Sequence, residues 1–179
     1  MTRSRGLGDV YKRQNVEINK FGGRFKYSKI NSLIDRVDNG ITSNITKVII
    51  RRDLKALLNQ FAQYELCYGN KFNINPAGYN IKSTGFTING FNDIAYITDV
   101  PNKDAAGNLD GSDMGTLSVV TKNNRGEQRV IVKDAGVVDY KKGEVILNTI
   151  NITSTVNQNN IIEVQAFPES NDVIGLKDL

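Results

Sequence analysis

The first regular pattern of apolar residues along the chain has the period of a helix. A set of apolar residues is spaced at i, i+3, i+4 and i+7, so its members share one helical face. These residues are Ile30, Leu33, Ile34 and Val37. Ser28 is a suitable N-cap, and an Asn-Gly pair such as Asn39-Gly40 is typical of a helix end. The pattern predicts a short helix from Ser28 to this stop.

The spacing of apolar residues then becomes mixed. Residues 45–52 are rich in β-branched side chains, which favours a strand with Val48 and Ile50 on one side. Residues 54–61 return to helical spacing, whereas the residues that follow, as far as Tyr68, alternate as in a strand. We therefore expect a helical crossover over residues 54–61 that leads into a strand.

After Gly69 the pattern is that of short strands separated by turn residues. Gly, Asn and Pro punctuate β-prone runs throughout this part of the chain. The predicted strands are Phe86–Ile88, Ile94–Thr98, Thr116–Lys122, Arg129–Lys133, Glu144–Asn151 and Ile161–Phe167. The fold class that follows is α+β and predominantly β: a short N-terminal helix followed by an antiparallel or mixed sheet.

The clearest local signal in the sequence is a tight hairpin over residues 137–145. Gly143 stands just before the return strand, at a position that requires a positive φ. Tyr140 is expected to pack over the turn.

The excess of positive charge is concentrated at the N-terminus. The chain has a formal net charge of +4, but four basic residues and one acidic residue fall within residues 1–14, so the remainder is nearly neutral. That balance does not favour nucleic acid as a partner, and the short apolar runs do not favour a membrane. The segment SRGLGDVYKRQ, residues 4–14, resembles translated sequencing-adaptor read-through.

These observations divide the chain into three predicted parts. Residues 1–14 are interpreted as an artefactual or disordered segment, and residues 15–27 as a linker that contains the Gly22-Gly23 pair. Residues 28–179 are expected to form one α+β domain that is truncated at its end.

The sequence offers few groups for catalysis. There is no histidine, which removes the commonest general base and a common metal ligand. Cys67 is the single cysteine and is interpreted as a small core residue. The acidic loop from Asp104 to Asp113 lacks the spacing of a calcium loop and is interpreted as solvated. We therefore expect no enzymatic activity, no cofactor and no metal.

Two clusters are candidates for contacts with other proteins. Arg51 and Arg52 beside Asp53 are expected to make ion pairs at a surface or interface rather than to bind phosphate. A set of aromatic residues on an apolar segment suits either core packing or a subunit interface. The set consists of Phe61, Tyr64 and Tyr68.

Several segments together resemble a known family. They read KFGGRFKYSK, GITSNITKVIIRRDL, YELCYGN, GVVDYKKGEVIL and VQAFPESNDVIGLKDL. In this order, over residues 16–179, the chain is similar to the carboxy-terminal part of the baseplate wedge subunit of T-even-like contractile-tailed phages, a baseplate J-like family. The resemblance implies a structural protein without catalytic residues. It also implies a homodimer or ring with copies of itself, contacts with other wedge proteins, assembly in the host bacterial cytoplasm and a final place in the tail baseplate of the virion.

Two other functions are weighed against this one. Short strands, frequent turns and asparagine-rich loops also suit an extracellular β-sandwich that binds a carbohydrate or protein ligand. The lack of tryptophan and of a signal sequence disfavours it. An enzyme that uses paired carboxylates, such as a glycosidase, has the least support, because the acidic residues are scattered.

Overall fold

A computed structural model describes residues 24–37, 40, 42–123 and 125–174. The chain divides into two compact units, the first made of Met1–Val48 with Ser170–Leu179 and the second of Ile49–Glu169. The predicted artefactual segment, residues 1–14, and most of the predicted linker lie outside the described residues. The predicted single domain over residues 28–179 stays a prediction.

The described part of the first unit contains a helix and a two-stranded sheet. Helix α2 (Tyr27–Asp35) follows strand β1 (Arg24–Phe25), which pairs antiparallel with β11 (Val173–Ile174). The backbone N–H of Tyr27 donates to Asp172 Oδ1 at 2.8 Å, and its hydroxyl donates to the carbonyl of Thr46 at 2.8 Å. Tyr27 thus ties the start of the helix to the segment at Thr46 and to the segment just before β11.

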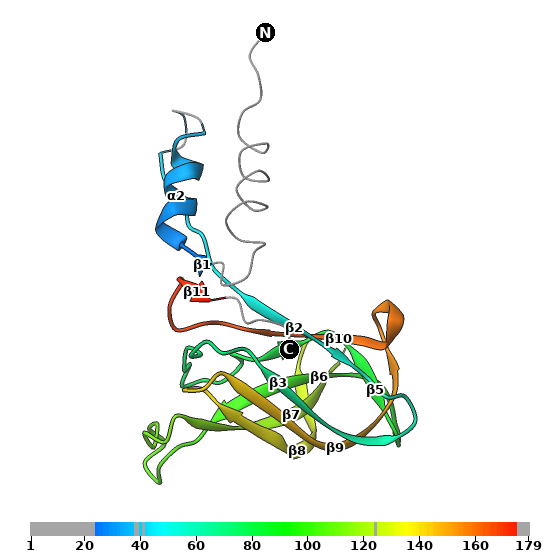
Figure 1. The fold of residues 1–179 in the computed structure, drawn as a ribbon. Coiled ribbons are helices and arrows are strands. Elements are labelled where there is room, and N and C mark those ends of the chain that lie inside the picture. The colour runs from blue at the N-terminus through cyan, green and yellow to red at the C-terminus, as the bar shows by residue number, and fades with distance from the viewer. Residues whose placement is uncertain (1–23, 38–39, 41, 124, 175–179) are drawn as a thin grey trace. The chain divides into compact units, whose positions relative to one another are not determined.

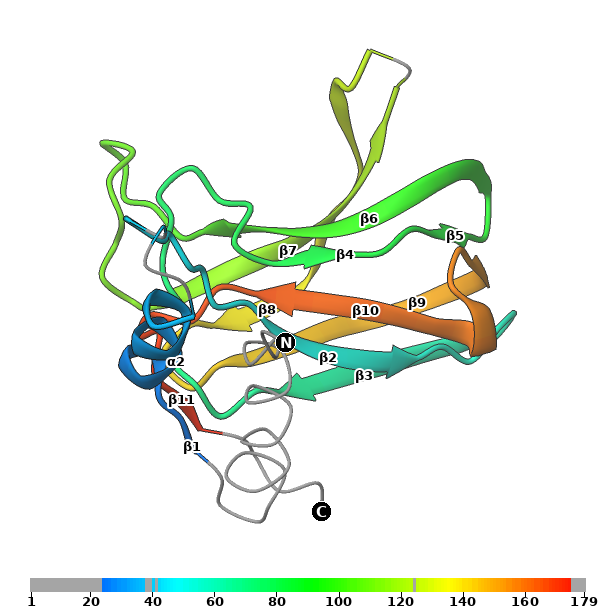
Figure 2. The same ribbon diagram turned by 90° about the horizontal axis from the view of Figure 1, so that it is seen from above.

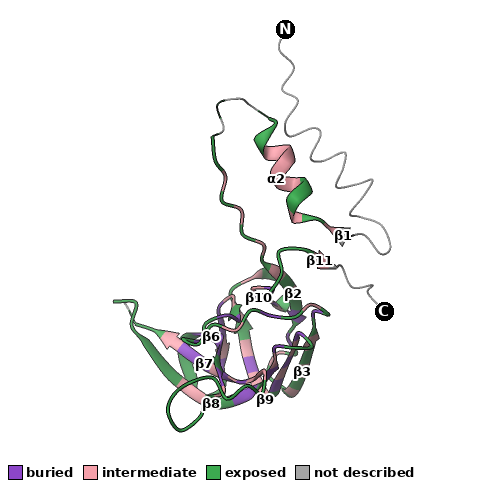
Figure 3. Cartoon of the chain, turned by 90° about the vertical axis from the view of Figure 1, so that its left-hand side faces the viewer, coloured by how far each residue is buried: buried purple, intermediate pink, exposed green. Residues whose placement is uncertain are grey.

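The helix boundaries differ from the expected ones. The N-cap is Lys26, which makes no side-chain capping bond, so the prediction that Ser28 caps the helix is wrong. The helix ends at Asp35, and Val37 beyond it is 52% exposed. Asn39 lies outside the described residues. Within α2 the apolar residues are only half buried (Figure 3).

The second unit is built on strands that close into a barrel (Figures 1 and 2). Strands pair antiparallel in the cyclic order β6, β5, β9, β8, β7 and back to β6. Their bounds are β5 (Phe86–Ile88), β6 (Phe91–Pro101), β7 (Met114–Lys122), β8 (Gln128–Asp139) and β9 (Glu144–Thr155). The predominantly β character expected from the sequence is confirmed. Closure satisfies the strand edges that an open sheet would leave unpaired.

Further strands extend the sheet beyond the barrel. Strand β4 (Lys82–Ser83) pairs with β6 and with β10 (Ile161–Ala166), and β10 pairs with β2 (Ile50–Lys55). On the other side, β3 (Phe61–Cys67) pairs with β9. A short 3-10 helix, η2 (Gln158–Asn160), connects β9 to β10.

Strands β2 and β3 meet at a seam that side chains bridge. Arg52 Nε on β2 donates to the carbonyl of Cys67 at 3.1 Å. The hydroxyl of Tyr64 on β3 accepts the backbone N–H of Leu57 at 3.0 Å. The first bond joins β2 to β3, and the second joins β3 to the segment that follows β2.

The expected helical crossover over residues 54–61 is wrong. Leu54 lies in β2, a turn covers residues 58–60, and β3 begins at Phe61. Leu54 and Ala56 are 3% and 4% exposed, whereas Leu57 is 52% exposed. Burial therefore follows a period of two here, and tertiary packing overrides the helical spacing of the leucines.

Other strand predictions are confirmed with changed ends. The strand Phe86–Ile88 is found at the expected residues, and β6, β7, β8 and β9 run longer than expected. The strand expected over residues 45–52 begins only at Ile50, and Ile45 is 91% exposed.

The core fills the inside of the second unit, where the buried residues gather (Figure 3). In β7 alternate residues point inward, and Leu117 and Val119 are fully buried. The largest fully buried apolar side chains are Phe72, Ile81, Phe86, Leu117, Leu147, Ile152 and Ile162. Each contributes about 1.5–3 kcal/mol relative to exposure.

The hairpin between β8 and β9 is confirmed. Gly143 has φ +73 and lies directly before β9. Tyr140 does not pack over the turn as expected. Its side chain is fully buried, and its hydroxyl reaches Asp99 on β6.

Candidate interface site on the barrel

The structure separates the three aromatic residues that the sequence grouped as a possible interface. Phe61 is 72% exposed, and Tyr64 is half buried with its hydroxyl bound to Leu57. Tyr68 is only 4% exposed and packs edge-on against Phe72, with ring centroids 5.1 Å apart. Tyr68 is therefore a core residue of this unit, and Phe61 is the member that presents an aromatic surface. A role of these three residues in a subunit interface stays a prediction.

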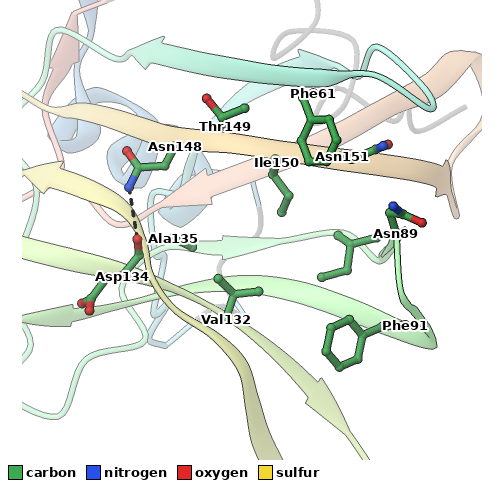
Figure 4. A pocket seen from close by; sticks show the side chains of 11 residues that line it. Phe61, Asn89, Phe91, Val132, Asp134, Ala135, Asn148, Thr149, Ile150 and Asn151 are labelled. Atoms are coloured by element: carbon green, nitrogen blue, oxygen red, sulfur yellow. Dashed lines mark hydrogen bonds between the residues drawn. The ribbon is translucent and has the colours of Figure 1, made fainter.

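Phe61 lies at the rim of a pocket of about 280 Å³. The pocket lies beside β9, between β8 and the β5–β6 turn (Figure 4). Its apolar lining includes Phe61, Phe91, Val132 and Ile150, and its polar lining includes Asn148 and Asn151. We call it the Phe61 pocket.

The register of β9 explains why a hollow forms at this place. Strand β9 pairs with β8 as far as Leu147 and with β5 from Ile152 onward. Residues 148–151 lie between these two ladders, where β8 and β5 diverge. The side-chain amide of Asn148 donates to the carbonyl of Asp134 at 3.1 Å and holds β8 at the edge of the gap.

Some polar groups of the pocket have a hydrogen-bond partner in the described part of the chain, and one does not. The carbonyl of Asn151 accepts the backbone N–H of Asn89 at 3.0 Å, which closes one end of the pocket. Its side-chain Oδ1 is buried without a hydrogen-bond partner among the described residues. Asp134 is exposed and has φ +53.

An aromatic ring beside amide groups is suited to contact with another polypeptide, because it combines apolar area with hydrogen-bonding groups.

Cys67 is exposed, so its assignment to the core is wrong. The side chains of β3 alternate, and Cys67 points outward between Leu66 and Tyr68. Its Sγ lies 3.5 Å from Glu65 Oε1. Partial desolvation, followed by the Glu65 carboxylate, raises the pKa of the thiol. The group is held as a thiol rather than as a reactive thiolate.

The charged clusters have structural partners. Arg51 pairs with Asp53 at 3.2 Å and with Glu163 at 3.0 Å, as expected of a surface ion pair. In the acidic loop, Asp104 Oδ1 accepts the backbone N–H groups of Ala106 and Asn108, each at 2.9 Å. These bonds shape the loop as local side-chain turns.

Sequence reasoning missed the most unusual titratable group of the barrel. Asp99 is 1% exposed, and its carboxylate accepts bonds from the Tyr140 hydroxyl at 2.7 Å and the Ile81 backbone N–H at 2.6 Å. Burial raises the pKa of Asp99, although both hydrogen bonds oppose the rise. The only signal for this buried group in the sequence is an aspartate at an inward position of a strand that is rich in β-branched residues.

Comparison with known protein families finds a similarity in the N-terminal part of the chain. Residues 6–53 match the family of baseplate structural protein gp6, C-terminal domain III. The match begins inside residues 1–14 and ends within β2, so it covers mainly the first unit. The attribution of residues 1–14 to adaptor read-through stays a prediction.

No curated protein matches the chain. Among the described residues, no helix is long and apolar enough to cross a membrane. Over residues 6–53 the chain is similar to C-terminal domain III of the baseplate structural protein gp6, which confirms the predicted resemblance to a phage baseplate wedge subunit.

Proposed function

We propose that this chain is a structural subunit of a phage tail baseplate that works by assembling with other proteins rather than by catalysis. The observation that carries the proposal is the match of residues 6–53 to a baseplate structural protein domain. In this function the chain joins copies of itself and other wedge proteins into a dimer or ring. It assembles in the host cytoplasm and ends in the virion tail.

The alternative of an extracellular β-sandwich module is not favoured. The matched family is a baseplate structural protein. The strands of the second unit also close on themselves through the pairing of β6 with β7, whereas a sandwich packs two separate sheets face to face.

Phe61 supports an interface with a second copy of this chain. Its ring is 72% exposed, and it lines the rim of the pocket beside it. A projecting side chain and a hollow therefore lie in one patch. A two-fold symmetric contact needs such a self-complementary patch, because each copy must offer both the knob and the hole. Aromatic residues centred on a pocket are also the residues that dominate binding energy.

The experiment is light scattering coupled to size exclusion on the full chain over a concentration series. We expect the parent chain to gain mass with concentration and the Phe61→Ser variant to do so far less. Val156→Ser is the matched control, because Val156 is also an exposed apolar residue, at 62%, and does not line the Phe61 pocket.

Two outcomes would count against this contact. A parent chain that stays monomeric at the highest concentration leaves no self-association to explain. Equal losses of mass in the Phe61 and Val156 variants would show that the interface does not centre on the pocket. Mass spectrometry of purified virions tests the wider proposal, which requires the chain among the tail proteins.

A further inference from the structure

A second pocket lies on the outer face of the barrel unit, away from Phe61. It has a volume of about 290 Å³ and lies where β4, β6 and β7 run side by side. Its lining includes Lys82, Lys122, Tyr79, Tyr96, Ser83, Thr98 and Gln128. We call it the lysine pocket.

The strand register places the two lysines on one face. Lys82 on β4 stands opposite Thr98 on β6. Tyr96, two residues before Thr98, stands opposite Val120 on β7, and Lys122 lies two residues beyond Val120. Directly paired residues and residues two apart share a face of a sheet. Lys82 and Lys122 therefore border one hollow from two different strands.

The charge of this hollow is unbalanced. Its lining contains two lysines and no acidic residue. Among the described residues, no ion pair joins Lys82 or Lys122 to a carboxylate. Each ammonium lies over an aromatic ring instead: Lys82 Nζ is 5.6 Å from the Phe167 centroid and Lys122 Nζ is 5.3 Å from that of Tyr96.

The acidic residue on the same face of β10 is already engaged. Glu163 lies two residues from Gln165, which stands opposite Lys82. Its carboxylate pairs with Arg51 at 3.0 Å. The two lysines thus keep their positive charge available to a group from outside the chain.

The floor of the pocket holds an unsatisfied hydroxyl. Thr98 is 6% exposed, and its Oγ1 is buried without a hydrogen-bond partner among the described residues. Beside it, Ser83 Oγ accepts the backbone N–H of Ile97 at 2.7 Å, which leaves the proton of that hydroxyl free to donate. A buried polar group without a partner is costly, so its presence points to a ligand that supplies the partner.

We propose that the lysine pocket binds an oxyanion, a carboxylate or phosphate group. Lys82 and Lys122 neutralise its charge from two sides, and Thr98 donates a hydrogen bond from the floor. Lysine ammonium groups act as point charges and impose little geometry, so they accept either anion. The binding is non-covalent and goes beyond the proposed structural function. The anion can be a free ion or an acidic side chain of another polypeptide.

The test is a heteronuclear NMR titration of the full chain at constant ionic strength. One arm uses inorganic phosphate as the free ion, and the other uses a hexaglutamate peptide as the polypeptide source. We expect saturable shifts at the amides of Thr98, Tyr96 and Lys82 in at least one arm. The Lys82→Gln/Lys122→Gln double variant should weaken binding by about tenfold or more, because charge-assisted bonds are lost.

Two further variants keep the result interpretable. Lys142→Gln removes an exposed lysine outside the pocket and should leave the affinity unchanged. Thr98→Val should weaken binding while keeping the lysines, and its amide spectrum reports whether the fold persists. Saturation by phosphate points to a free ion, and saturation by the peptide alone points to an acidic side chain. Absence of saturation in both arms, or equal binding by the double variant, overturns the proposal.

Discussion

The hydroxyl of Tyr140 donates a hydrogen bond of 2.7 Å to Oδ2 of Asp99 in the interior of the barrel unit. Tyr140 follows β8, Asp99 lies on β6, and both side chains are almost completely buried. Asp99 Oδ1 also accepts the backbone N–H of Ile81 before β4. One carboxyl therefore joins three parts of the chain that are distant in sequence.

Removing one partner from this contact should destabilise the barrel unit. In Tyr140→Phe, Asp99 loses a buried donor, and we expect the free energy of unfolding to fall by about 1–3 kcal/mol. Urea denaturation measures the change. Tyr64→Phe is the matched control, because the Tyr64 hydroxyl accepts a bond from an exposed backbone N–H, and its loss should cost less.

A double-mutant cycle shows whether the two side chains act as a pair. Asp99→Asn and Tyr140→Phe should be non-additive by about 0.5–3 kcal/mol, since the second change removes a bond that the first has already weakened. Strict additivity would mean that the two residues stabilise the fold independently.

The stability advantage that Asp99 provides should depend on pH. Burial raises the pKa of Asp99 above its ordinary value of 3.8. The folded state therefore binds the proton more tightly than the unfolded state. Its contribution is fully present below pH 3.8 and is lost as the pH rises through the folded pKa. We expect the stability difference between the parent chain and Asp99→Asn to shrink over this range.

The comparison with Asp99→Asn is needed because other carboxyls titrate in the opposite sense. Hydrogen bonds from Ser112 lower the pKa of Asp110, whose contribution is lost as the pH falls. This group is common to both proteins and cancels in the difference. A difference in unfolding free energy that stayed constant with pH, or grew, would contradict the assignment to Asp99.

The sequence predicts the strands of this protein better than it predicts their arrangement. Local signals were sufficient for Phe86–Ile88 and for Gly143 in its turn, since both depend on neighbouring residues. Barrel closure depends on the pairing of β5 with β9, which joins residues far apart in the chain, such as Phe86 and Thr155. No local pattern specifies those partners.

The same limit applies to individual residues of the candidate sites. Cys67 is apolar in character, but the alternation of β3 turns it outward. Asp99 is polar, yet partners from distant strands allow it to be buried. Lys82 and Lys122 border one pocket only because β4 and β7 both flank β6. Sequence reasoning placed Phe61 in a candidate interface from its type, whereas its exposure follows from the fold.

Phe61 and Tyr68 should respond oppositely to truncation, although they belong to one aromatic segment. Phe61→Ala removes a ring that is 72% exposed and should change the unfolding free energy of the monomer by less than about 0.5 kcal/mol. Tyr68→Ala leaves a cavity beside Phe72 and removes a bond to the carbonyl of Val164, so it should cost about 3–5 kcal/mol. Urea denaturation at low protein concentration gives both values. A large cost at Phe61 would show that its ring packs within its own chain.

Gly143 should be intolerant of any side chain for two separate reasons. Its φ of +73 disfavours residues with a Cβ, and a Cβ there would collide with the backbone carbonyl oxygen of Asn70. Gly107→Ala is the matched control, because Gly107 has φ +85 but open space around it. We expect Gly107→Ala to cost about 1–2 kcal/mol from the backbone conformation alone. Gly143→Ala should cost about 1–3 kcal/mol more, because the segment at Asn70 must shift away from the hairpin. Equal unfolding free energies for the two variants would mean that the hairpin and the Asn70 segment separate without cost.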